Sequence, residues 1–161
     1  MRFRHLQHYV AMIMVSSALV LSTIFSLIAY QINQRIAEEE SERQVKDLMA
    51  AVRNTASAAL FSTNETVGMD AINGLLGTDV VYSVSLEGFA DEFNPGMKLS
   101  GVNKEGGAPM KMISMTLESF FDAEHLLGEL KVAPNQRWVS QRTHDTSIPT
   151  IIGLIFVIFV S

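Results

Sequence analysis

The stretch Tyr9–Gln34, YVAMIMVSSALVLSTIFSLIAYQINQ, contains no charged residue, and it decides the architecture of the chain. Its apolar part, Tyr9–Tyr30, has twenty-two residues, which is enough for one helix to cross a bilayer. Arg2 and Arg4 precede this part, and a run of three glutamates begins eight residues after it, at Glu38. By the positive-inside rule, the N-terminus stays in the cytoplasm and the chain beyond the apolar part is exported. The stretch therefore predicts an uncleaved transmembrane anchor.

A cleaved signal peptide is the main alternative to an anchor, and a buried helix of a soluble protein is the other. A signal peptide has a shorter apolar core that ends in a cleavage site of the small-x-small kind. The end of the apolar run, SLIAYQINQ (Ser26–Gln34), is a poor site of that kind. The anchor is therefore the favoured interpretation.

A second apolar run, PTIIGLIFVIFVS (Pro149–Ser161), closes the sequence. A helix over Ile148–Ser161 would rise about 21 Å, whereas a bilayer core is about 30 Å thick. We expect this run to be the outer part of a second transmembrane helix that continues for about six more residues. Thr146 or Ser147 is suited to cap a new helix there, and proline is favoured in a first turn. Pro149 is therefore predicted to form a joint between an exported stalk and the membrane helix.

The composition excludes several classes of function. The 161 residues include no cysteine, which rules out disulfides, thiolate zinc sites and cysteine nucleophiles. The net charge is −5 and no basic patch is evident, so nucleic-acid binding is not expected. His125 lies near Glu124 and Glu129, but no second histidine has the spacing of a metal ligand. No serine lies in a nucleophile elbow, so we expect no catalytic residue, metal or cofactor.

The helix that leaves the membrane is predicted to run from Gln31 to about Thr63, because this stretch has no proline or glycine and many helix formers. Five residues of it form a stripe at helical spacing: Val45, Leu48, Val52, Thr55 and Ala59. The stripe fits a helix that packs against its own domain, and it fits equally a parallel coiled-coil contact in a homodimer. Two heptads do not separate these interpretations, and one helix can serve both.

A shorter helix is predicted next, within residues 63–77. Thr63 or Asn64 is suited to cap it, and Gly77 is suited to end it. Its apolar face has four residues: Val67, Ala71, Ile72 and Leu75.

The stretch VVYSVSLEG (Val80–Gly88) has the alternation and the β-branched and aromatic residues of a strand. Val80, Tyr82, Val84 and Leu86 are expected on one face. The stretch therefore predicts the first strand of a small sheet.

Two further strands are expected within MKMISMTLE (Met110–Glu118) and HLLGELKV (His125–Val132). The polar, glycine-rich stretch Met97–Pro109 predicts a loop or a loosely held hairpin. Pro134 should end the last strand, and Asn135–Ser147 returns to helical character.

These elements predict an α+β fold: an anchor, a long helix, a small antiparallel sheet and an exit helix into a second, incomplete membrane helix. The expected segments are a cytoplasmic leader (1–8), a transmembrane helix (9–30), a periplasmic domain with its flanking helices (31–147) and the start of a second transmembrane helix (148–161).

The exported part resembles periplasmic PAS-like sensor domains of the CHASE/Cache kind. The pieces that carry the resemblance are a helix end (Ala56–Phe61), a second helix end (Ile72–Leu76), a strand (Val80–Gly88) and LLGELKVAPN (126–135), which is similar to the family's last strand. The similarity covers roughly residues 45–140 and rests on the order of these pieces. The chain departs from the family pattern at Leu86-Glu87, and no ligand signature of the family is present.

The resemblance implies the input region of a bacterial inner-membrane receptor, because such domains precede diguanylate cyclases, histidine kinases and chemoreceptor outputs. A periplasmic stimulus would then shift the Gln31–Thr63 and Asn135–Ser147 helices relative to each other across a homodimer, and so act on a cytoplasmic output domain. A small-molecule pocket, if present, would lie against the sheet. Its expected lining residues are Tyr82, Val84, Phe89, Met112, Ser114 and Phe120, which are equally suited to form the core of a small domain.

Two other functions fit the same sequence. The exported domain could bind a periplasmic or outer-membrane protein instead of a small ligand, with the loop Asn94–Pro109 as the docking segment. The chain could also be an enzyme subunit or a structural membrane protein that is complete as written.

Overall fold

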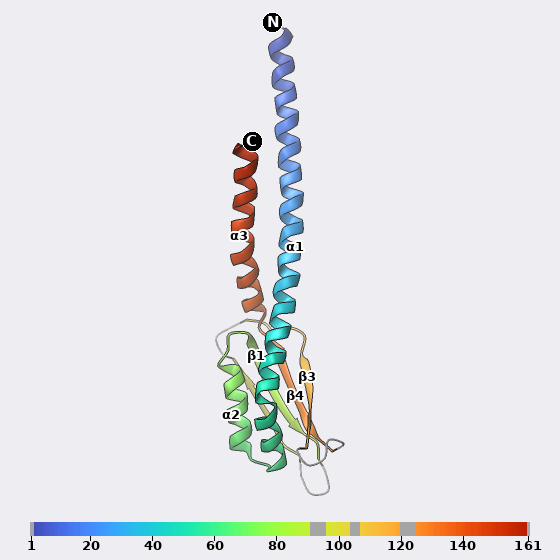
Figure 1. Cartoon of the computed structure of the whole chain (residues 1–161), viewed down its shortest axis with the longest axis vertical. Coiled ribbons are helices and arrows are strands. Elements are labelled where there is room, and N and C mark those ends of the chain that lie inside the picture. Colours follow the sequence, from blue (N-terminus) through green and yellow to red (C-terminus); the bar gives the residue numbers. More distant parts are fainter. Residues whose placement is uncertain (1, 91–95, 104–106, 120–124, 161) are drawn as a thin grey trace. The chain divides into compact units, whose positions relative to one another are not determined.

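The computed structural model describes residues 2–90, 96–103, 107–119 and 125–160, and it has the predicted α+β architecture (Figure 1). Its elements are α1 (Arg2–Phe61), α2 (Glu65–Leu76), β1 (Val81–Gly88), β2 (Lys98–Val102), β3 (Ile113–Glu118), β4 (Leu126–Pro134) and α3 (Gln136–Val160). The chain divides into two compact units. The first, called the helix pair, comprises residues 1–37 and 141–161; the second, called the sheet domain, comprises residues 38–140.

α1 is one uninterrupted helix of 60 residues. It contains neither proline nor glycine, so nothing in its sequence breaks the hydrogen-bond ladder. The predicted anchor and the predicted long helix are therefore two parts of a single element. α1 ends in a tight turn at Thr63, whose φ of 50° is left-handed. Asn64 then caps α2 as predicted, because its side chain accepts hydrogen bonds from the backbone N–H groups of Thr66 and Val67.

The sheet is antiparallel, with the strand order β2-β1-β4-β3. The predicted first strand and the two later ones are confirmed as β1, β3 and β4, and β4 ends at Pro134 as expected. β2 corrects the prediction for Met97–Pro109, because it pairs with β1 over five residues. β2 is an edge strand whose residues are mostly exposed, so it has little of the apolar alternation by which strands are recognised.

Helices α1 and α2 supply the other half of the core of the sheet domain. On the sheet, the buried side chains include Val84 and Leu86 of β1 and Leu130 and Val132 of β4. Those from the helices include Val45, Met49, Leu60, Ile72 and Leu75. The apolar face predicted for α2 is confirmed: Ala71, Ile72 and Leu75 are buried and Val67 is half-buried.

The start of β1 differs from the prediction. A β-bulge lies between Val81 and Ser83, so that Val81 is fully buried and Tyr82 is only half-buried. An extra residue in a bulge shifts every side chain before it to the other face of the strand. The predicted alternation therefore holds for Val84 and Leu86 but fails at Tyr82.

α3 also differs from the prediction at Pro149. The helix runs without interruption from Gln136 to Val160, with Pro149 in its interior. The hydroxyl of Thr146 donates to the carbonyl oxygen of Arg142 one turn earlier, which is a bond of a helix interior and not of a cap. No new helix begins at Thr146 or Ser147. A proline inside a helix still removes one N–H donor, here the one that would reach the carbonyl of Asp145. The predicted joint at this position stays a prediction.

Candidate functional site

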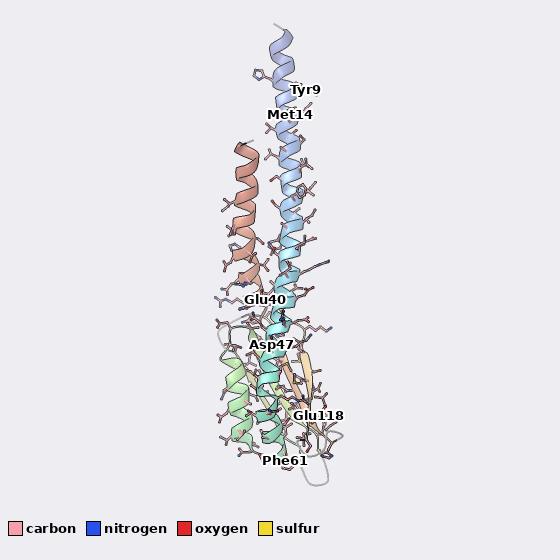
Figure 2. All side chains as sticks on the ribbon, in the orientation of Figure 1. Tyr9, Met14, Glu40, Asp47, Phe61 and Glu118 are labelled. Atoms are coloured by element: carbon pink, nitrogen blue, oxygen red, sulfur yellow. The ribbon has the colours of Figure 1, made fainter. Side chains whose placement is uncertain are left out.

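The apolar part of α1 is long and apolar enough to cross a membrane. Its large side chains point outward, with exposed fractions such as 67% for Tyr9 and 66% for Met14, both labelled in Figure 2. The hydroxyls of Ser16, Ser17 and Thr23 each donate to a backbone carbonyl three or four residues earlier in the same helix. These three groups therefore need no partner from water, as lipid surroundings require.

Within the helix pair, the partly covered residues of α1 form one stripe of small or polar side chains. They are Ala18, Ser22, Ser26, Ala29 and Asn33, followed by the buried Ala37. α3 contributes the buried Thr143 and Ser147 to this unit. Small side chains at spacings of three and four residues allow two helices to approach closely, both in water and in lipid.

One hydrogen bond fixes the register of the helix pair. The amide Nδ2 of Asn33 donates to the hydroxyl Oγ of Ser147 over 3.1 Å (α1 and α3 in Figure 1). Asn33 lies three residues beyond Tyr30, and Ser147 immediately precedes Ile148. The bond therefore joins the two helices where the apolar part of α1 ends and the apolar run of α3 begins.

Asn135 connects β4 to α3 and holds this junction in the sheet domain. It is only 7% exposed, and its Oδ1 accepts from the backbone N–H of Arg137, which caps α3. Its Nδ2 donates to the carbonyl oxygen of Asp79 over 3.2 Å, and its backbone N–H donates to the carbonyl oxygen of Val80 over 2.7 Å. One side chain thus ties the start of α3 to the segment that enters β1.

The segment before β3 is tied to the same junction. The backbone N–H of Gln136 donates to Ala108, and the backbone N–H of Met110 donates to Pro134. Gly107 has a φ of +137°, and a side chain on it would collide with Oδ1 of Asn135. Sequence reasoning missed Asn135, although an asparagine that directly precedes a helical stretch is a recognisable cap signal.

The second face of the sheet carries polar side chains. Register places Ser85 beside both Ser100 and Lys131, and Lys131 beside Ser114. The next row aligns Lys98, Glu87, Glu129 and Thr116 across the four strands. This face is therefore rich in hydroxyls and in charges of both signs.

Glu87 is the centre of the charges on this face. Its two carboxylate oxygens each lie 2.7 Å from a lysine Nζ, one from Lys98 and one from Lys131. Lys131 also lies 3.1 Å from Glu129. The hydrogen bond from Lys131, and then that from Lys98, lower the pKa of Glu87 from 4.5 to about 2. The hydrogen bond to Glu87 raises the pKa of Lys131.

Glu87→Gln should reduce the loss of stability that the protein undergoes as the pH falls from 7 to 2. Because the folded state lowers the pKa of Glu87, its contribution is complete above about pH 4.5 and is lost as the pH falls towards 2. Lys131 keeps its charge throughout this window, since its own pKa is raised. Unfolding midpoints measured from pH 7 to pH 2 should therefore fall less steeply in the variant. Asp70→Asn, an exposed carboxylate outside the cluster, is the control and should leave the slope unchanged.

A groove of about 410 Å³ lies on the flank of α1, and Asp47, labelled in Figure 2, is one of its lining residues. The lining residues are Gln44, Asp47 and Leu48 of α1 with Thr78 and Val80 of the connection from α2 to β1. The lining is mainly apolar. Of these five residues, sequence reasoning singled out Leu48 and Val80, and neither was assigned to a groove.

The residues predicted to line a ligand pocket are not brought together. Val84 is 1% exposed in the core, whereas register places Ser114 on the opposite face of the sheet. Phe89 and Met112 are 48% and 57% exposed, and Tyr82 is half-buried. Phe120 lies outside the described residues.

The five residues predicted to form a stripe on the long helix are not all buried. Val45 and Ala59 are fully buried in the core of their own domain, and Leu48 and Val52 pack against that core. Thr55 is exposed. The stripe is therefore an intrachain packing face, which is one of the two roles that the sequence allowed. The homodimer stays a prediction.

Among the described residues, no three His, Asp or Glu side chains gather closely enough to hold a metal ion. Comparison with family models, with curated proteins and with solved structures gives no match to this chain.

Proposed function

We propose that this chain is the sensory input region of a bacterial inner-membrane signalling receptor. In this proposal α1 is the first membrane span, the sheet domain is periplasmic, and α3 leads into a second span. A periplasmic stimulus acts by favouring one arrangement of the two helices over another. That bias passes to a cytoplasmic output domain, such as a diguanylate cyclase or a histidine kinase.

The observation that carries the proposal is the continuity of α1. One helix contains the lipid-compatible segment around Met14 and also Val45, Met49 and Leu60, which are buried in the core of the sheet domain. A change of packing in that core therefore acts directly on the element that enters the membrane. The resemblance to PAS-like sensor domains of the CHASE/Cache kind supports the same assignment.

The second span is supported by the composition of α3 and by the bond at its midpoint. The residues of α3 after Pro149 include no charged side chain. The Asn33–Ser147 hydrogen bond aligns the start of this run with the end of the apolar part of α1. Two antiparallel spans would begin at the same level in this way.

Cysteine labelling in spheroplasts tests the topology. The chain has no cysteine, so a single introduced thiol reports its own position. In spheroplasts, a membrane-impermeant maleimide should label Asn73→Cys in α2 but should label Arg4→Cys only after lysis. The reverse pattern, or labelling of both without lysis, would contradict the proposal.

A chimaera tests the signalling role. The chain is joined through α3 to the cytoplasmic half of a receptor kinase whose output is measured in cells. Asn135→Ala should change the output by about threefold or more, because it releases the junction between the sheet and α3. Asn73→Ala, in an exposed position on α2, is the matched control. Equal output from both variants at equal protein levels would contradict a role in signalling.

The register of the helix pair predicts a specific cross-link. Asn33→Cys combined with Ser147→Cys should form an intrachain disulfide under mild oxidation, because the two side chains meet in the structure. Ile32→Cys with Ser147→Cys is the control, since Ile32 is 52% exposed. We expect about fivefold more cross-linking in the first pair, measured as the loss of free thiol. Similar yields from both pairs would show that this register is wrong.

A second candidate function, protein docking, is favoured by three exposed apolar side chains of the sheet domain. Phe61, Phe89 and Leu126 have exposed fractions of 54%, 48% and 49%. Residues next to them in the chain are in contact. A side chain on either Gly88 or Gly128 would meet Leu60, which precedes Phe61, and Phe89 donates its N–H to the carbonyl of Leu127. In this alternative a periplasmic partner protein, in place of a small ligand, supplies the stimulus.

The docking candidate is tested by Phe61→Ser combined with Phe89→Ser in the chimaera. Loss of the response to periplasmic extract, with retained folding, would favour a partner protein. An unchanged response would exclude this surface.

A further inference from the structure

The groove beside α1 has polar side chains that present mainly hydrogen-bond acceptors. One N–H of the Gln44 amide donates to Glu40, which leaves its second N–H and its carbonyl oxygen available. The hydroxyl hydrogen of Thr78 is likewise used, since it is donated to the carbonyl oxygen of Leu75 over 2.7 Å. Asp47 contributes a carboxylate, which has acceptors only. The three polar side chains of the lining thus present three acceptor groups, and the second N–H of the Gln44 amide is the one side-chain donor left among them.

Asp47 is exposed, and its carboxylate forms no ion pair among the described residues. Within the described residues, no lysine, arginine or histidine lies within ion-pair distance of its carboxylate. By contrast, Glu87 and Glu129 on the second face of the sheet are paired with lysines. Leu48 and Val80 supply an apolar wall beside this charge. The groove therefore complements a cation carried on an apolar body.

The groove is lined by α1 and by the segment that is hydrogen-bonded to the cap of α3. One wall is α1 itself, and the other is the segment from Thr78 to Val80. Asn135, which caps α3, is hydrogen-bonded to the carbonyl oxygens of Asp79 and Val80 in that segment. A molecule in the groove touches α1 on one side and the residues that hold the first turn of α3 on the other.

We infer that this groove is a binding site for a small organic cation, a primary ammonium group on an apolar body. The ammonium carries three N–H donors, which match the carboxylate of Asp47, the amide oxygen of Gln44 and the hydroxyl oxygen of Thr78. The volume of about 410 Å³ is that of a small-molecule site. The coupling of this site to α3 rests on the proposed receptor function, whereas binding itself does not.

The experiment titrates 2-phenylethylamine into the full chain in lipid nanodiscs, and calorimetry measures binding. Trp138, the single tryptophan of the chain, lies in the first turn of α3 and packs against the core, so its fluorescence reports on the start of that helix. We expect saturable binding of the amine below about 1 mM. The neutral analogue 2-phenylethanol and the anion 3-phenylpropionate should bind at least about tenfold more weakly.

Asp47→Asn keeps the shape of the groove and removes its charge, so it should weaken amine binding about tenfold or more. Asp70→Asn on α2 is the matched control and should bind as the unmodified chain does. Three results would overturn the site: no amine binding at about 10 mM, equal binding of the alcohol, or equal affinity after Asp47→Asn. Binding without a change in Trp138 fluorescence would keep the site and reject its coupling to α3.

Discussion

Gly128→Ala should destabilise the sheet domain by about 3 kcal/mol, a large part of the stability of a small domain. Gly128 is buried in β4, opposite Gly88 of β1. A methyl group there would press against the backbone carbonyl of Glu87 and lie 2.7 Å from Leu60 and 2.9 Å from the Cα of Gly88. Two of these neighbours are backbone atoms of the last two residues of β1, which pair with Glu129 and Gly128, so they cannot move aside without disturbing that end of the ladder.

Gly74→Ala is the matched control for this substitution. Gly74 lies in the interior of α2, and an added methyl group meets nothing within 4 Å. Alanine is favoured over glycine in a helix, so this variant should gain about 0.5–1 kcal/mol. Unfolding by guanidinium, followed through Trp138 fluorescence, measures both variants. A Gly128→Ala protein as stable as the unmodified chain would show that β1 and β4 are not packed as described.

Asn135→Ala should cost about 2–4 kcal/mol and should also free the start of α3. Removal of the side chain deletes the cap on the N–H of Arg137, which is typically worth about 1 kcal/mol. It also leaves the carbonyl oxygen of Asp79 without this donor, at a cost of about 1–3 kcal/mol if no water replaces it. The two losses fall on the same junction, so they should appear together in one unfolding transition.

Asn135→Ser separates the two contributions. Serine is a good helix cap, but its short side chain cannot also reach Asp79, so the loss should be about half that of the alanine variant. Hydrogen exchange of the first turn of α3 provides the second measurement. The alanine variant should lose protection there and the serine variant should keep most of it. Equal hydrogen-exchange protection of this turn in the alanine and serine variants would show that Asn135 does not cap α3.

The helical parts of the fold could be predicted well from the sequence, because the signals are local. The absence of proline and glycine over Arg2–Phe61 predicts a helix without reference to any neighbour. Asn64 caps α2 through bonds to residues two and three positions away. In each case, the residues that determine the structure lie within one or two turns of the feature.

The sheet was harder to predict, because its edges and irregularities depend on partners distant in sequence. β2 is recognisable only through its pairing with β1, since Lys98, Ser100 and Val102 are exposed and only Leu99 and Gly101 face inward. The bulge after Val81 is set by the register against β4, and it reverses the expected face of the residues before Ser83. Neither feature has a signal of its own in the sequence.

The candidate sites were harder to predict from the sequence than the sheet. The predicted pocket residues were chosen as apolar or aromatic neighbours of strands, and such residues are also the material of the core, as Val84 demonstrates. The groove combines residues of α1 with Thr78 and Val80, some thirty positions later. Asp47 is distinguished only by its place beside Leu48 and Val80, and that place depends on how the connection from α2 to β1 lies against α1.

The unbroken course of α1 has a consequence for how insertions in it are tolerated. Each residue of an α-helix turns the chain by about 100°, so one residue inserted between Asn33 and Val45 would rotate the side chains of α1 after the insertion by that angle. Seven inserted residues would restore the phase to within about 20°. Eleven residues, about three turns, would do the same, so the phase of the side chains along α1 is kept only by insertions close to a whole number of turns.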